Sequence, residues 1–221
     1  MKVNNFVDVK QVKEAEGFQE FQKLPLGKII KANWKLFTLC VILAGSVGST
    51  NQFLVIFFGT YNFDVLGIIE RSLMHKYISI AIIFYMVFSI VGGYLADKFG
   101  QYLISSLAVF AILILSVVLC LQINSLMFSK VTFIAIAGFL PFVTMPAAAT
   151  FKQSIPIAIR YRVFALSHAI GSVIISAPTA FLSTWLYHKT KISWLPIVYF
   201  ITTIIMIFFA LYHLHKRKII D

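Results

Sequence analysis

The chain has 221 residues, of which 60% are hydrophobic and 12% are charged, against about 45–50% and about 25% in soluble domains. This composition excludes a water-soluble monomer. The net charge is +11, but the cations flank apolar runs instead of gathering on a water-facing patch, which argues against a nucleic-acid partner.

Residues 1–35 are polar and mixed in charge and precede the first apolar run. A cleavable signal peptide would place an apolar stretch near the start, so we expect this segment to stay attached. Its Phe6, Phe18, Phe21 and Leu24 are compatible with an amphipathic helix on the membrane surface. A solvated tail on the cytoplasmic side is the preferred interpretation.

Six windows free of Asp, Glu, Lys and Arg each approach or exceed the roughly 20 residues that a helix needs to cross a bilayer. They cover residues 36–58, 77–95, 102–123, 131–151, 163–187 and 193–214. Residues 108–121 are apolar on every side, which excludes the alternating pattern of a membrane β-barrel. The sequence therefore predicts an all-α, polytopic membrane protein with a six-helix domain over residues 36–214.

The short flanks of these windows set the expected orientation. Fourteen of the 19 Lys and Arg residues fall on the side that holds both ends of the chain, counting those of the tail and of residues 215–221. Because short cytoplasmic loops carry an excess of Lys and Arg, both termini are expected in the cytoplasm, and residues 215–221 form a short basic tail there.

The sequence contains no pattern that is typical of an enzyme active site. Cys40 and Cys120 lie inside apolar windows, and the five histidines are scattered along the chain, so no metal site or cofactor is expected. A catalytic serine would need a base within reach, and the chain has no Gly-x-Ser-x-Gly turn. We therefore expect no enzyme activity.

Two motifs carry a resemblance to a known family. Residues 93–100 (GYLADKFG) resemble the cytoplasmic loop signature of the major facilitator superfamily. Residues 155–161 (IPIAIRY) are similar to the F-P-x-x-[VI]-R-[YF] segment of the metabolite:proton symporters, a group that includes bacterial proline/betaine and dicarboxylate carriers. The order of the motifs matches the C-terminal six-helix half of that family, and 221 residues are too few for twelve spans.

The resemblance implies half of a proton-coupled carrier in a bacterial inner membrane, in which two six-helix halves rock around a midplane site. It assigns the cytoplasmic gate to Gly93, Asp97, Lys98, Gly100 and Arg160. We expect Asp97 to dock against the start of the fifth helix near Arg160 and Arg162. An anion is favoured beside the N-terminal end of a helix.

Polar residues inside the first and fourth windows are the candidates for contact with a solute. These are Asn51, Gln52 and Thr144, although small polar residues in membrane helices often serve only to pack helices together. His168 is a candidate for proton coupling, because intramembrane ionisable groups are usually functional. The alternative is a neutral histidine bonded to a backbone carbonyl.

The leading hypothesis is a truncated or split secondary carrier of a small polar solute such as proline, betaine or a dicarboxylate. The alternative is a membrane scaffold or assembly protein without transport. In either case one face of a half-carrier would leave polar groups against lipid, at a cost of several kcal/mol each. We therefore expect a second six-helix half, or a second copy of this chain, as a partner beside the lipid bilayer.

Overall fold

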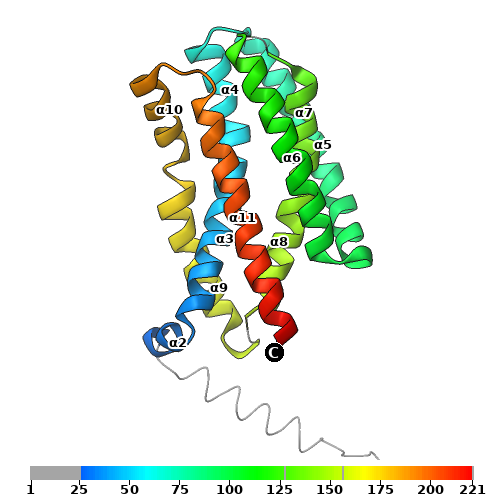
Figure 1. Ribbon diagram of the computed structural model, residues 1–221, viewed down its shortest axis with the longest axis vertical. Helices are drawn as coiled ribbons and strands as arrows, with labels where there is room; N and C mark the ends of the chain where they lie inside the picture. The colour runs from blue at the N-terminus through cyan, green and yellow to red at the C-terminus, as the bar shows by residue number, and fades with distance from the viewer. Residues whose placement is uncertain (1–25, 127, 156, 221) are drawn as a thin grey trace, which may run out of the picture.

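The computed structural model describes residues 26–126, 128–155 and 157–220, and every element among them is helical (Figure 1). Six helical runs are long and apolar enough to cross a membrane, as predicted. We name them span 1 to span 6: Trp34–Val65, Arg71–Phe99, Gln101–Asn124, Lys130–Gln153, Arg160–Thr190 and Leu195–Lys216. Span 1 begins and span 6 ends at the bottom of Figure 1, which we call the lower end.

Three spans are single regular helices and three are interrupted. The regular ones are α5 (Arg71–Phe99), α6 (Gln101–Asn124) and α11 (Leu195–Ile220). Span 1 joins α3 (Trp34–Gln52), the π-helical η1 (Phe53–Phe57), α4 (Phe58–Thr60) and the π-helical η2 (Tyr61–Val65). Span 4 joins α7 (Lys130–Phe139) and α8 (Pro141–Gln153), and span 5 joins α9 (Arg160–Gly171), the π-helical η4 (Ser172–Ser176) and α10 (Thr179–Thr190). Two short helices lie outside the spans: α2 (Leu26–Ala32) precedes span 1, and the 3-10 helix η3 (Ile157–Ile159) lies between spans 4 and 5.

Most of the helices extend beyond the predicted windows. The windows are restricted to stretches free of charged residues, whereas a helix keeps its backbone hydrogen bonds as it enters the polar boundary. Span 2, predicted over 77–95, runs from Arg71 to Phe99. The tail predicted over 1–35 is helical from Leu26, and its first 25 residues lie outside the described residues. The tail predicted over 215–221 is a continuation of α11 as far as Ile220.

The spans form two layers. Span 4 packs on spans 2 and 3, span 1 packs on spans 5 and 6, and spans 1 and 4 meet through α3 and α8. Spans 2, 4, 1 and 5 therefore form a four-helix layer, and spans 3 and 6 form the second layer, which is nearer the viewer in Figure 1. We call the surface of the four-helix layer that is turned away from spans 3 and 6 the broad face.

This packing repeats every three spans. Span 1 packs on spans 5 and 6, and span 4, three spans later, packs on spans 2 and 3. The contact of span 2 with span 3 corresponds in the same way to that of span 5 with span 6. Span 1 runs upward from the lower end and span 4 runs downward (Figure 1). The bundle thus has the arrangement of two three-helix repeats of inverted topology.

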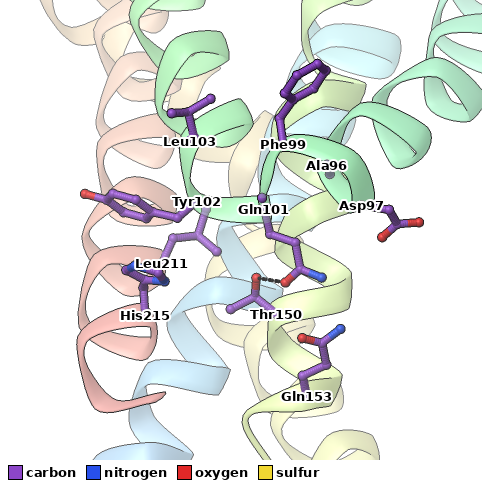
Figure 2. Close-up of a pocket in the computed structure, with 11 residues that line it drawn as sticks. Ala96, Asp97, Phe99, Gln101, Tyr102, Leu103, Thr150, Gln153, Leu211 and His215 are labelled. Carbon is purple, nitrogen blue, oxygen red and sulfur yellow. Dashed lines mark hydrogen bonds between the residues drawn. The ribbon is translucent and has the colours of Figure 1, made fainter. Parts of the chain in front are cut away.

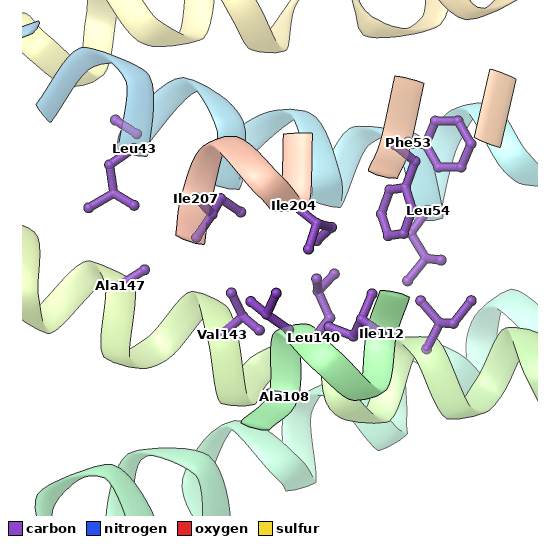
Figure 3. Packing of buried hydrophobic residues seen from close by; sticks show 14 of the residues in the cluster. Leu43, Phe53, Leu54, Ala108, Ile112, Leu140, Val143, Ala147, Ile204 and Ile207 are labelled. Carbon is purple, nitrogen blue, oxygen red and sulfur yellow. The ribbon is translucent and has the colours of Figure 1, made fainter. Parts of the chain in front are cut away.

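The core lies where spans 1 and 4 meet spans 3 and 6. Leu43, Leu54, Ile112, Leu140 and Ile204 are almost wholly buried there, and their side chains converge from four helices (Figure 3). Lipid tails are as apolar as leucine, so close van der Waals packing, more than the hydrophobic effect, holds such helices together.

Spans 1 and 5 approach each other closely through glycines. A Cβ built on Gly171 would lie 2.5 Å from the Val41 carbonyl oxygen and 2.8 Å from the Gly45 amide nitrogen. One turn farther along α3, Ser49 Oγ and Thr179 Oγ1 form a buried hydrogen bond of 2.7 Å. Small residues thus let two backbones meet and join them by a polar contact.

Candidate functional site

A small cavity lies near the middle of the bundle, between spans 1, 2 and 4. Its volume is about 230 Å³, and Asn51 and Tyr85 are the polar residues among those that line it. The remaining lining residues are Leu54, Val55, Ile78, Ala81, Ile82, Phe133 and Ala137. Val55 and Ile82 are 41% and 48% exposed, so the cavity opens on the broad face. We call it the midspan cavity.

Asn51 is the polar group of this cavity that remains available. It is half-buried, and its amide forms no hydrogen bond with any residue that the structure describes. An amide offers two donors and an acceptor oxygen. In apolar surroundings these groups favour whatever polar partner reaches them.

Thr144, a predicted contact for a solute, is not among the residues that line the midspan cavity. It is 1% exposed, and its Oγ1 lies 2.9 Å from the Tyr85 hydroxyl oxygen in a hydrogen bond. Thr144 therefore does not line the cavity itself but fixes the orientation of Tyr85, which does. Tyr85 escaped the sequence analysis, although it is the one tyrosine in the interior of window 77–95.

Gln52 follows Asn51 directly and so points about 100° farther round the helix. It is half-buried and is not part of the lining of the midspan cavity. The structure therefore brings together Asn51 and the Tyr85–Thr144 pair, and it leaves Gln52 apart. Binding of a solute by any of the three stays a prediction.

A second, larger cavity of about 600 Å³ lies at the lower end, where the turn between α5 and α6 faces the ends of α8 and α11 (Figure 2). Thr150 Oγ1 donates a hydrogen bond of 2.9 Å to Gln101 Oε1 and so ties α8 to the first residue of α6. The His215 ring stacks on the Tyr102 ring, with centroids 4.6 Å apart and planes 6° from parallel. We call this second cavity the lower cavity.

The predicted docking of Asp97 on the start of span 5 is absent from this structure. Asp97 lines the lower cavity, is exposed, and makes no ion pair or hydrogen bond with the residues that the structure describes. The guanidinium of Arg160 is engaged elsewhere, because its Nε donates to the Ile155 carbonyl oxygen at 3.1 Å. The gate role assigned to both residues stays a prediction.

The other predicted gate residues lie on the last two turns of α5 and in the turn that leads to α6. Gly100 has a φ of +96°, which a residue with a Cβ rarely adopts, so glycine is required where the chain reverses. Gly93 faces open space, since a Cβ there would meet nothing within 4 Å. Lys98 Nζ lies 5.4 Å from the centre of the Phe99 ring, a cation–π distance.

His168 is exposed and lines neither cavity. Its Nδ1 lies 3.4 Å from Ser172 Oγ, one turn along, and its ring stacks on that of Phe164 with centroids 6.0 Å apart. The partner it finds is thus a serine hydroxyl, not the backbone carbonyl of the alternative interpretation. A role in proton coupling stays a prediction.

Comparisons with protein-family models, with curated proteins and with solved structures find no match for this chain. The layer arrangement and the two cavities are the features from which a function is proposed.

Proposed function

We propose that this chain is a half-length secondary carrier of the major-facilitator type, resembling the metabolite:proton symporters, that moves a small polar solute across a bacterial inner membrane. In this proposal both termini are cytoplasmic, so the lower end faces the cytoplasm. A second six-helix half completes the carrier across the broad face.

The observation that carries the proposal is that spans 1 and 4, which correspond in the repeat, are both interrupted. In carriers built from inverted repeats, the solute site lies at the repeat interface and is formed by interrupted helices at corresponding positions. Spans 1 and 4 correspond in this bundle, and both are interrupted, span 1 by η1 and η2 and span 4 by the break at Pro141. The midspan cavity lies between these two spans and span 2.

The polar groups of the midspan cavity suit a small solute with its own donors or acceptors. Asn51 is the eighteenth residue of the 32 in span 1, which puts its amide near the middle of the bilayer. Tyr85 presents a hydroxyl whose orientation Thr144 fixes. Proline, betaine and dicarboxylates are the solutes that the family resemblance suggests.

The second part of the proposal is that the lower cavity forms the cytoplasmic gate of the carrier. The hydrogen bond from Thr150 to Gln101 joins α8 to the α5–α6 turn. The stacked rings of Tyr102 and His215 join α6 to α11. Asp97 lines this cavity and has no partner among the residues that the structure describes, so it is available to dock in another state of the carrier.

The alternative is a membrane scaffold without transport, and one observation favours it. Among the described residues, Asp97 is the sole carboxylate that lines either cavity, and it lies at the end of its span. A proton-coupled carrier ordinarily places an ionisable group on the solute path.

The test is uptake by the purified chain in liposomes, with labelled proline, betaine and succinate offered under a proton gradient. Asn51→Leu should reduce uptake by at least tenfold, because the lost amide is the free polar group of the midspan cavity. Phe110→Leu, on the exposed side of span 3, is the matched control and should leave uptake unchanged. The chain is tested alone and together with the other membrane proteins of its source; if no solute is taken up in either case, or if Asn51→Leu behaves like the control, the proposal fails.

A further inference from the structure

The polar and apolar residues of the midspan cavity lie at different heights in the bundle. Span 1 runs upward, whereas spans 2 and 4 run downward (Figure 1). Spans 1 and 2 are in register near the top of the cavity, where a Cβ built on Gly59 would lie 2.6 Å from Ile78 Cδ1. Asn51 comes eight residues before Gly59, and Tyr85 comes seven residues after Ile78. At about 1.5 Å per residue, Asn51 and Tyr85 therefore lie at a similar level, roughly 10 Å below Gly59 and Ile78.

The Tyr85 hydroxyl is also directed toward this lower side of the cavity. Its hydrogen bond of 2.9 Å is to Thr144. Thr144 comes seven residues after the lining residue Ala137, so it lies roughly 10 Å farther down span 4. Asn51 and Tyr85 are the polar residues of the lining. The lower side of the midspan cavity is therefore its polar side.

The upper side of the cavity is apolar. Leu54 and Val55 follow Asn51 by about one turn of the upward span 1, and Ile78 precedes Tyr85 by about two turns of the downward span 2. These three upper side chains are aliphatic and carry no donor or acceptor. A polar group that reaches the upper side is left without a side-chain partner there, which is unfavourable.

We propose that the midspan cavity selects a small solute that is polar at one end and apolar at the other, and holds its apolar end upward against Leu54, Val55 and Ile78. This selectivity rests on the proposed function and deepens it by naming the class of solute. The cavity of about 230 Å³ is smaller than the roughly 300–1,000 Å³ of pockets for drug-sized ligands, so the solute has few heavy atoms. A dicarboxylate is excluded, because one of its two charged ends would lie among aliphatic side chains.

Proline and trans-4-hydroxyproline test this orientation. They differ by one hydroxyl, on the side of the ring that is far from the carboxylate. Held as proposed, proline places ring methylenes on the upper side, whereas hydroxyproline places its hydroxyl there without a partner. The kcat/KM of uptake in liposomes should therefore favour proline roughly tenfold to a hundredfold, as expected when a hydrophobic pocket meets an added hydroxyl. Succinate should not be taken up.

Val55→Thr tests where the hydroxyl of hydroxyproline lies. Threonine has nearly the shape of valine, and its hydroxyl supplies a hydrogen-bond partner on the upper side of the cavity. The preference for proline should fall roughly threefold to tenfold, the effect of one hydrogen bond. Val117→Thr is the matched control. Val117 is 55% exposed on span 3 and does not line the cavity, so this change should leave the preference unaltered.

A binding measurement separates the selectivity from transport, because each solute that binds stabilises the chain in SDS titration. Stabilisation by proline but not by hydroxyproline, without uptake of either, supports the selectivity and overturns the carrier. Equal uptake of both, uptake of succinate, or a preference that Val55→Thr leaves unchanged supports the carrier and overturns the selectivity. If neither proline nor hydroxyproline binds or is taken up, the selectivity is overturned, and uptake of betaine would then still support the carrier.

Discussion

Gly171→Ala tests the packing of span 1 on span 5. The added Cβ would lie 2.5 Å from the Val41 carbonyl oxygen, 2.8 Å from the Gly45 nitrogen and 3.1 Å from its Cα. All three atoms are backbone, so no side-chain rotation relieves the clash, and α9 must move away from α3. Overpacking of this kind costs about 1–3 kcal/mol.

The same displacement stretches the hydrogen bond of 2.7 Å between Ser49 and Thr179, and an interhelical bond in a membrane is worth about 0.6 kcal/mol on average and ~1.7 at most. Gly171→Ala should therefore lower the free energy of unfolding by about 2–4 kcal/mol. The assay is SDS titration in mixed micelles followed by tryptophan fluorescence. Gly138→Ala is the control, because its Cβ would meet the Phe88 ring at an ordinary 3.5 Å. Equal effects of the two substitutions would refute the reasoning.

Three further predictions concern orientation, a surface ion pair and the midspan cavity. Cysteines placed at Lys130 and Lys189 should react with an impermeant maleimide added outside the cell, and reaction only after the membrane is opened would reverse the topology. Asp64→Asn should change the unfolding free energy by less than about 1 kcal/mol, because its ion pair with Arg71 is exposed; a larger loss measured by SDS titration would contradict this. Thr144→Val should lower the free energy of unfolding by about 1 kcal/mol in the same titration, because it removes the hydrogen bond to Tyr85, and it should also weaken uptake. A variant with unchanged stability and uptake would show that this hydrogen bond is not needed.

The spanning segments were predictable from the sequence because crossing a bilayer imposes a length and an apolar composition that few other structures need. Span 3 differs from its window, 102–123, by one residue at each end. The ends of span 1 were less predictable, since the helical path continues through Asp64 to Val65. The predicted window ends at Phe58, and a window free of charged residues cannot include a final turn that contains Asp64, whose carboxylate accepts a hydrogen bond from Arg71.

The partners of each helix could not be predicted. In residues 108–121, for example, almost every position is apolar, so no stripe marks the side that faces protein and the side that faces lipid. Val109 is buried and Phe110 is 63% exposed, although both are apolar. Tyr85 was missed for the same reason, because its importance comes from Thr144, 59 residues later in the chain. The docking of Asp97 was expected from a motif and from the attraction of an anion to a helix N-terminus, and neither determines where the guanidinium of Arg160 finds its acceptor.

The two repeats do not have equal capacity to deform, and this asymmetry bears on how a carrier built from this bundle would move. Span 5 contains η4 and Pro178, whereas span 2, its counterpart in the repeat, is one uninterrupted helix of 29 residues. A π-helical turn and a proline both weaken the regular hydrogen-bond ladder, and sharp bends in helices occur at such places. Rearrangement is therefore easiest in spans 1, 4 and 5, with span 2 as the rigid wall of the midspan cavity. Tyr85 lies on span 2, the rigid wall, and Asn51 lies on the interrupted span 1. Bending of span 1 therefore changes the distance between these two polar side chains. That distance decides whether both reach one small solute.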